Sequence, residues 1–213
     1  MIKVIKDFLP QPLFNYMKNV VENNAMMWEF NSTNLNDDVP GAKEVKLGRT
    51  FYVYPPLSST GKEYYDRELM PLFGVFQPFI EEHMEDRCKP TKMVRMKMNL
   101  YPNHGESKKH GIHYDIATNG RADPNIVTSV FNFTTCNGTT ILLDKDKKEI
   151  VVPSIENSMV IFNGTHLHYG TTQTDTNKRI VLNTNIYKAE VDPFSDVDTT
   201  TGETEFEPLD DYF

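Results

Sequence analysis

The chain has 213 residues, of which 38% are hydrophobic, 11% aromatic and 24% charged. These proportions exclude an intrinsically disordered chain, and the length suits one domain with a substantial buried core. The formal net charge of −8 at pH 7 disfavours nucleic acid as a partner, because an acidic protein repels a phosphate backbone.

The N-terminal segment Met1–Pro10 alternates charged and apolar residues. It contains no long apolar stretch, so it resembles neither a signal peptide nor a membrane anchor. The two cysteines, Cys88 and Cys136, are too few for a disulfide framework and lack zinc-motif spacing, so we expect reduced thiols. The sequence therefore predicts a soluble protein without a membrane partner, located in the cytoplasm, or in the host cytoplasm if the chain is viral.

The first ninety residues mix short strands with amphipathic helices. Apolar residues recur at helical spacing in three segments, while two others alternate in the manner of strands. The predicted elements are the strands Ile2–Ile5 and Phe51–Tyr54 and the helices Gln11–Asn23, Gly61–Phe73 and Gln77–Arg87. We expect residues 1–90 to form a mainly helical support.

After Pro90 the pattern changes to short alternating runs that are separated by turn signals, which is typical of a β-sandwich or barrel. The predicted fold class is α+β and mainly β, with a double-stranded β-helix (jelly-roll) core at residues 91–191 and the N-terminal helices packed outside it. Residues 1–191 would form one domain, and the acidic residues 192–213 a C-terminal extension. The predicted strands are Met93–Tyr101, Ile112–Asp115, Ile126–Thr134, Thr139–Leu143, Glu149–Val152, Ser158–Phe162 and Arg179–Tyr187.

Histidines paired with nearby carboxylates are the main chemical signal. Two histidines and one carboxylate can hold Fe(II) on one side and leave the other positions for a cosubstrate and dioxygen. The chain has three His-x-acid matches, His83-Met84-Glu85, His104-Gly105-Glu106 and His113-Tyr114-Asp115. The first falls in a predicted helix, where residues two apart do not share a face, and the second in a polar loop. The third is expected at a strand edge, Ile112–Ile116, where alternate side chains project together, so we predict it to supply ligands.

The third ligand must come from another strand, and His166 and His168 are both candidates. The residues Phe162-x-Gly164-x-x-x-His168-x-Gly170, followed by Arg179, resemble a motif of the Fe(II)/2-oxoglutarate-dependent dioxygenase superfamily. The resemblance is to its prolyl-4-hydroxylase-like branch and to small oxygenases of bacteriophages and marine microbes, and it covers about Met93–Tyr187. It favours His168. The interval from His168 to Arg179 is slightly long, so Lys178 stays an alternative to Arg179.

The resemblance implies that His113, Asp115 and His168 bind Fe(II) and are the catalytic residues. The cosubstrates would be 2-oxoglutarate and O2, with ascorbate as a further candidate cofactor. Arg179 would pair with the far carboxylate of 2-oxoglutarate, because a guanidinium can bind a carboxylate through two parallel hydrogen bonds. The Tyr101 hydroxyl would also bind the cosubstrate. Strand alternation suggests further pocket residues, of which Asn183 is assigned to the cosubstrate site; the others are Asn99, Ser129, Phe131 and Asn185.

The activity implied by the resemblance is hydroxylation of a peptidyl residue, with proline among the candidates, or of an amino acid or other small molecule, with succinate and CO2 as coproducts. Two alternatives stay open. One is a nucleic-acid-modifying 2-oxoglutarate oxygenase, which the acidic charge disfavours. The other is a noncatalytic jelly-roll binding module whose histidines only satisfy hydrogen bonds. We expect the loops Pro55–Tyr65, Asn103–Gly111 and Ile116–Asn125 to select the substrate.

Overall fold

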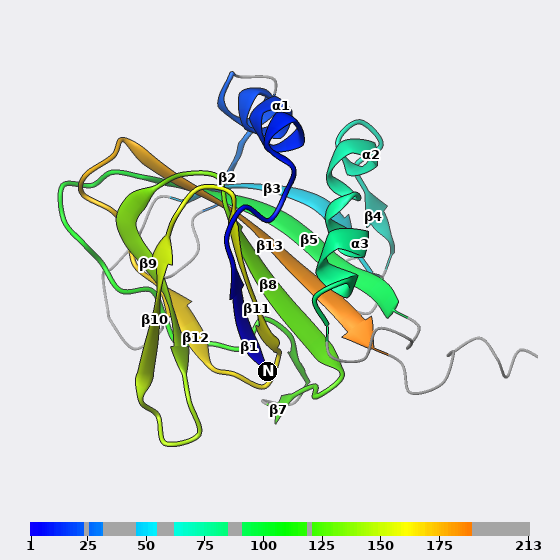
Figure 1. Cartoon of the computed structure of the whole chain (residues 1–213), viewed down its shortest axis with the longest axis vertical. Coiled ribbons are helices and arrows are strands. Elements are labelled where there is room, and N and C mark those ends of the chain that lie inside the picture. Colours follow the sequence, from blue (N-terminus) through cyan, green and yellow to red (C-terminus); the bar gives the residue numbers. More distant parts are fainter. Residues whose placement is uncertain (24–25, 32–45, 55–61, 85–90, 119–120, 189–213) are drawn as a thin grey trace, which may run out of the picture.

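The computed structural model describes residues 1–23, 26–31, 46–54, 62–84, 91–118 and 121–188, which form two antiparallel β-sheets with helices on one side (Figure 1). The larger sheet has the order β1-β11-β8-β13-β5-β3-β2, with β4 beside β3. Its strands are β1 (Ile2–Ile5), β2 (Glu29–Asn31), β3 (Lys46–Val53), β4 (Tyr64–Tyr65), β5 (Thr91–Pro102), β8 (Ile126–Asn132), β11 (Ser158–Asn163) and β13 (Lys178–Lys188).

The smaller sheet has the order β10-β9-β12, and a separate two-stranded ribbon joins β6 to β7. These strands are β9 (Cys136–Leu143), β10 (Glu149–Ser154), β12 (His168–Gly170), β6 (Ala117–Thr118) and β7 (Arg121–Ala122). Two facing antiparallel sheets with helices outside confirm the predicted fold class, mainly β with a jelly-roll core.

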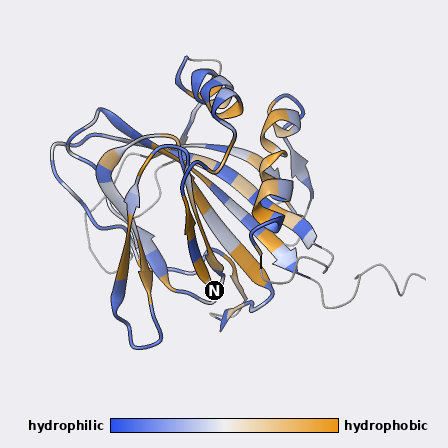
Figure 2. Cartoon of the chain, viewed as in Figure 1, coloured by the Kyte–Doolittle hydropathy of each residue, from blue (hydrophilic) through white to orange (hydrophobic). Residues whose placement is uncertain are grey.

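One face of the larger sheet, here called the helix face, is covered by α1 (Gln11–Glu22), α2 (Met70–Phe73) and α3 (Phe76–Glu81) (Figure 1). Figure 2 shows hydrophobic and hydrophilic residues interspersed along the strands, and Met96 and Met98 of β5 lie in the buried cluster beneath the helices. Aromatic rings dominate the contact, and the centroids of Phe76 and Phe131 lie 4.9 Å apart. The shared buried cluster includes Phe14, Met96 and Leu182.

The opposite face of the larger sheet, here called the inner face, packs against the smaller sheet. Tyr101, Val130 and Val181 from the larger sheet form one buried cluster with Leu142 and Val152 from the smaller sheet. The polar residues that could bind a ligand are therefore placed between two layers rather than on the outer surface. The helices pack on the helix face of the larger sheet, opposite the smaller sheet, and support the larger sheet from that side.

Strand alternation in β5 was predicted correctly from Arg95 onward and wrongly at Val94. The register between β13 and β5 shifts after Asn185, which pairs with Arg95, whereas the next residue of β13 pairs with Met93. Val94 is thus the extra residue of a β-bulge, and a bulge changes the direction of side chains. Val94 joins a small cluster with Ile116 instead of the helix-face cluster.

The helices near residue 70 differ from the prediction. Of the helix expected between Gly61 and Phe73, only the last part forms, because residues 64–65 form β4 and α2 begins only at Met70. Asp66 explains the late start: its Oδ1 accepts hydrogen bonds from the backbone N–H groups of Glu68 and Leu69, both at 3.1 Å, and this turn precedes α2. The third helix ends at Glu81 rather than Arg87, and residues 85–90 lie outside the described residues.

The strands β1 and β3 join the larger sheet, so the N-terminal ninety residues contribute strands as well as helices. The predicted extension at residues 192–213 lies outside the described residues, and the division of the chain into domains stays a prediction. Of the helices in the described ranges, none has the length and apolar character needed to span a membrane.

Candidate metal centre and anion site

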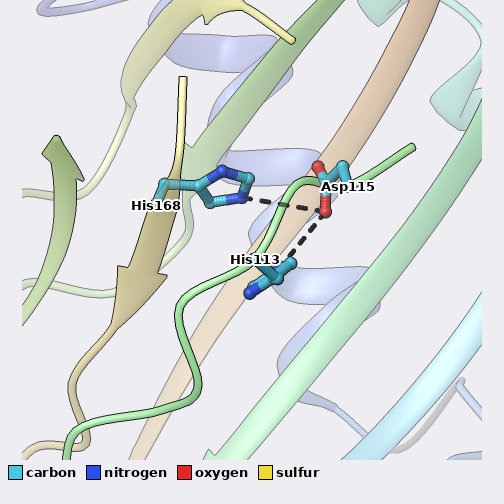
Figure 3. A group of neighbouring side chains, drawn as sticks. All are labelled: His113, Asp115 and His168. Carbon is cyan, nitrogen blue, oxygen red and sulfur yellow. Dashed lines mark ion pairs between the residues drawn. The ribbon is translucent and has the colours of Figure 1, made fainter. Parts of the chain in front are cut away.

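His113, Asp115 and His168, the three residues expected to bind a metal, converge at the start of β12 (Figure 3). The Oδ1 atom of Asp115 lies 3.6 Å from Nε2 of His113 and 3.7 Å from Nε2 of His168. These distances are too long for ordinary hydrogen bonds, and each pair of ligand atoms lies within 4.8 Å. Within the described part of the chain, this is the one group of three such residues that could hold a metal ion.

The second nitrogen of each imidazole ring fixes the orientation of the site. Nδ1 of His113 contacts the carbonyl oxygen of Gly111 at 2.8 Å, and Nδ1 of His168 contacts that of His166 at 3.2 Å. A ring that donates from Nδ1 to a carbonyl directs the lone pair of Nε2 to a metal. Nε2 of His168 is buried and has no hydrogen-bond partner among the described residues. The donor set therefore fits Fe(II), which imidazole and carboxylate ligands suit.

The backbone that carries the His-x-Asp pair is not a strand, so the predicted element Ile112–Asp115 is wrong. His113 forms a single antiparallel bridge with His168, with N–H to carbonyl distances of 3.0 Å in both directions. Asp115 follows in a bend. The two ligands still approach each other, because the bridge fixes His113 beside the third ligand and the bend returns Asp115 toward it.

Asp115 is held by groups from the larger sheet. Its side chain is 4% exposed, and its Oδ1 pairs with Nη2 of Arg95 at 2.8 Å. Its Oδ2 accepts a hydrogen bond from Nδ2 of Asn185 at 3.1 Å. Burial alone would raise the pKa of Asp115, but the charge of Arg95 and the close approach of the two histidines outweigh burial and hold this pKa well below its usual range. The carboxylate is therefore ionised and ready to bind a cation.

The other histidines do not join this group. Nδ1 of His166 faces the carbonyl oxygen of Leu143 at 3.3 Å, and Nδ1 of His83 contacts that of Phe79 at 2.9 Å. His104 is exposed in its loop. The described geometry thus agrees with the preference for His168 over His166, and it separates the third His-x-acid match from the other two.

Arg179 forms a second polar centre on the inner face. It is 2% exposed, and its guanidinium donates to Oγ of Ser154 at 2.8 Å, to the carbonyl oxygen of Thr171 at 3.2 Å and to Oγ1 of Thr140 at 3.0 Å. All three acceptors are neutral, and no described carboxylate pairs with this cation. Burial lowers the pKa of Arg179, yet an arginine side chain keeps its charge in proteins. A buried cation with neutral partners could bind an anion, because buried charges are usually paired.

Two glycines leave room for the guanidinium. A Cβ atom on Gly138 would lie 2.9 Å from Cδ of Arg179, and one on Gly170 would lie 3.2 Å from its Nη1. Both contacts are closer than side-chain carbons normally allow. Gly170, the residue beside the guanidinium, is two residues beyond His168, which corresponds to about 7 Å along a strand. A five-carbon dicarboxylate can bridge such a separation.

The loop Asn103–Gly111 lies beside this anion site. The N–H of His110 donates to the carbonyl oxygen of Gly170 at 2.9 Å, and the N–H of Lys108 donates to Oγ1 of Thr172 at 2.7 Å. The ring of His110 lies 4.8 Å from that of Tyr101. This loop is expected to select substrate, and its contacts place it beside Gly170 and Thr172, next to Arg179. Of the expected loop at Pro55–Tyr65, residues 55–61 lie outside the described residues.

The pocket residues predicted from alternation divide between the two faces. Tyr101 and Asn99 face inward, and so does Asn183; the Tyr101 ring centroid lies 5.8 Å from Cζ of Arg179. The Oδ1 atoms of Asn99 and Asn183 are buried without a hydrogen-bond partner among the described residues, which suits a ligand-binding surface. The prediction that Ser129 and Phe131 line the pocket was wrong, because these residues of β8 lie on the helix face of the sheet.

Several residues of the two centres were not predicted. Thr140, Ser154 and Thr171 around Arg179 carry no sequence signal, since threonine and serine are common on strands. Arg95 did carry a sequence signal. It is the first polar residue on one side of an alternating strand, and a charged residue on an inward face needs a partner. Lys178, the alternative to Arg179, directly precedes it on β13, so its side chain projects to the other face.

No protein-family model matches the sequence, and a search of curated proteins finds no significant match. Solved structures do match. An oxidoreductase of the 2OG-Fe(II) oxygenase family from Burkholderia pseudomallei aligns with a TM-score of 0.66 and 9% identity, over 87% of this chain and 85% of that one. A prolyl-4-hydroxylase from Pseudomonas putida aligns with a TM-score of 0.55 and 13% identity, over 88% and 92% of the two chains.

A third match is a prolyl hydroxylase from Trichoplax adhaerens, solved with a peptide fragment of the hypoxia inducible factor oxygen degradation domain. It aligns with a TM-score of 0.57 and 12% identity, over 88% of this chain and 82% of that one. These identities are low, so the likeness concerns the fold. The chain therefore has the fold of the 2OG-Fe(II) oxygenases, prolyl hydroxylases included, and this confirms at the level of the fold the resemblance found in its sequence.

Proposed function

We propose that the protein is an Fe(II)- and 2-oxoglutarate-dependent oxygenase that hydroxylates a peptidyl or amino-acid substrate. One observation carries the proposal: a convergent His-Asp-His group and a buried guanidinium with neutral partners lie near each other, linked by residues 168–171. Many proteins contain a metal site, and many contain a buried arginine, so neither feature alone indicates this function. Their combination matches a cosubstrate that chelates the metal at one end and carries a carboxylate at the other.

In this proposal His113, Asp115 and His168 hold Fe(II), and Arg179 binds and orients the far carboxylate of 2-oxoglutarate. When bound, Fe(II), 2-oxoglutarate and O2 supply the oxidising chemistry, with succinate and CO2 as coproducts. Tyr101 lies beside the guanidinium and contributes a hydroxyl to the same ligand. The role of the protein is to position these groups.

The surroundings of the site keep water away from the cosubstrate. Val130, Val160 and Val181 are each at most 3% exposed and form an apolar floor on the inner face. Asn183 follows Val181 on the same side of β13 and offers a buried amide, which we assign to the cosubstrate. An apolar floor with a few convergent polar groups is the usual composition of a small-molecule site.

A peptidyl substrate is supported by a neighbour of the same fold, the Trichoplax prolyl hydroxylase, which was solved with a peptide. The net charge of −8 disfavours the nucleic-acid alternative. Fold alone does not determine the substrate, so the assay must sample several classes. We include prolyl peptides, other peptides, free amino acids and nucleotides.

Succinate formation tests the function. Purified protein is incubated with Fe(II), 2-oxoglutarate and each substrate class in air, and succinate is quantified together with the mass of the product. The proposal predicts stimulated succinate formation with one class and a product heavier by one oxygen atom. Asp115→Ala and His168→Ala should abolish both, while His166→Ala should retain them. Absence of succinate with the metal-loaded unaltered protein would favour the noncatalytic binding module.

A further inference from the structure

The position of the Asp115 carboxylate is not determined by its own backbone. His113 is tied to β12 by its bridge, whereas Asp115 lies in a bend and makes no backbone ladder bond within the described residues. If residues 112–115 formed a strand, strand alternation would orient the carboxylate, but these residues do not form a strand. Groups that contact the carboxylate must therefore orient it, and these come from β5 and β13.

Arg95 and Asn185 form a closed ring of contacts with this carboxylate. Nη2 of Arg95 lies 2.8 Å from Oδ1 of Asp115, and Nε of Arg95 donates to Oδ1 of Asn185 at 2.9 Å. Nδ2 of Asn185 donates to Oδ2 of Asp115 at 3.1 Å and to Oγ1 of Thr128 at 3.0 Å. Asn185 is fully buried, at 0% exposure. Both carboxylate oxygens are thus fixed, one by each partner.

A β-bulge in β5 accompanies the contacts between the larger sheet and the bend that contains Asp115. Arg95 and Asn185 are directly paired across β5 and β13, immediately before the register shift. Val94, the extra residue, packs with Ile116. Two consecutive residues of β5 therefore contact two consecutive residues of the bend, an apolar contact at Ile116 and an ionic contact at Asp115. Bulges next to functional sites commonly redirect side chains in this way.

We propose that Arg95 and Asn185 are positioning residues that orient Asp115 for metal binding. This inference rests on the proposed function. The two contacts hold the carboxylate so that Oδ1 faces the two histidines (Figure 3), and Oδ1 keeps a second lone pair for the metal while it accepts from Arg95. Neither residue belongs to the group of His113, Asp115 and His168 that would hold the metal. Hydrogen-bond partners of metal ligands typically change metal affinity by about 10- to 100-fold when they are removed.

The test measures binding of Mn(II), a stable substitute for Fe(II), by electron paramagnetic resonance of the free ion. Arg95→Met removes a charge and its donors, and Asn185→Leu removes donors without changing charge. We expect each variant to bind Mn(II) about 10- to 100-fold more weakly. The loss of a nearby cation would by itself strengthen binding of Mn(II) by Arg95→Met, so weaker binding shows an orienting effect rather than a charge effect. The double variant should lose less than the product of the single losses, because both residues act on one carboxylate.

Arg49→Met is the matched control. Arg49 pairs with the buried Asp66 at 2.6 Å, an arginine–aspartate contact like that of Arg95 but away from the three metal ligands. This control should retain the Mn(II) affinity of the unaltered protein. Arg95→Lys should bind Mn(II) with an intermediate affinity, because an ammonium can pair with Asp115 but cannot hold the fork geometry to Asn185.

The outcomes separate this inference from the proposed function. Folded Arg95→Met and Asn185→Leu proteins that bind Mn(II) within about twofold of the unaltered protein would overturn the positioning role and leave the metal site intact. If Arg95→Met fails to fold, Asn185→Leu and Arg95→Lys decide by the same criterion. Failure of the unaltered protein to bind Mn(II) would overturn the metal site, and with it both proposals.

Discussion

Replacement of Arg179 by methionine should weaken cosubstrate binding without destabilising the protein. Methionine keeps an unbranched apolar stem beside Tyr101 but removes the guanidinium. Two charge-assisted hydrogen bonds to a carboxylate contribute about 1.5 to 3 kcal/mol each, so their loss should cost at least about 3 kcal/mol of binding free energy. At 1.4 kcal/mol per tenfold change, this corresponds to a dissociation constant for 2-oxoglutarate that is higher by roughly 100-fold or more.

The free protein should respond differently. Arg179 makes three hydrogen bonds to neutral acceptors but has no described carboxylate to offset the cost of burying its charge. Removal of an unpaired buried charge offsets the loss of these bonds, so we expect the free energy of unfolding without ligand to stay within about 1 kcal/mol. An arginine that was purely structural would show the reverse pattern, with lower stability and unchanged ligand affinity.

The assay is isothermal titration of 2-oxoglutarate into Mn(II)-loaded protein under anaerobic conditions, with urea unfolding of the same samples. Arg49→Met carries the same substitution at an arginine that pairs with a carboxylate, and it should lose stability while it keeps the affinity for 2-oxoglutarate. Tight binding of 2-oxoglutarate by Arg179→Met would refute the assignment of this guanidinium to the cosubstrate.

Three further variants test other parts of the site and its support. Gly138→Ala places a methyl group 2.9 Å from Cδ of Arg179, so we expect roughly tenfold weaker 2-oxoglutarate binding by titration. The second variant is Arg49→Met. Burial raises the pKa of Asp66, but the pairing of Asp66 with Arg49 outweighs burial, so the pKa is lowered overall. The pair therefore stabilises the fold above about pH 4, and this stabilisation is lost as the pH falls and the carboxyl group is protonated. The stability difference between the unaltered protein and Arg49→Met, about 2 kcal/mol near neutral pH from the lost hydrogen bonds to a charged group, should therefore shrink in urea unfolding at about pH 3; a constant difference would contradict this. His166→Ala should bind Mn(II) with unchanged affinity, and a large loss would reassign the third ligand.

The core strands were predictable because they are short runs rich in apolar and β-branched residues, and turn residues separate these runs. The prediction failed where local contacts outweighed this pattern. The side chain of Asp66 accepts hydrogen bonds from the backbone of the turn before Met70, so α2 begins later than the spacing of apolar residues had predicted. The bulge at Val94 breaks alternation through a register shift between two strands, which a single strand's sequence does not encode.

The candidate site was predictable to the extent that its chemistry is rare. Two imidazoles, a carboxylate and a following arginine in one order have few other uses, so the grouping of His113, Asp115 and His168 could be predicted although the segment Ile112–Asp115 is not a strand. The contacts that hold these groups could not be found in the same way. Arg95 meets Asp115 only through sheet pairing and a bulge, and its polar surroundings in the sequence resemble those of a solvated strand face.

Anaerobic titration of the protein with Fe(II) and 2-oxoglutarate tests the central claim most directly. A chelating 2-oxo acid on Fe(II) held by two histidines and one carboxylate should give a weak visible charge-transfer band, which saturates at one Fe(II) per chain. The account predicts this band in the unaltered protein, its loss in Asp115→Ala, and its appearance only at much higher 2-oxoglutarate concentration in Arg179→Met. Absence of the band in the folded, unaltered protein at saturating Fe(II) and 2-oxoglutarate would contradict it.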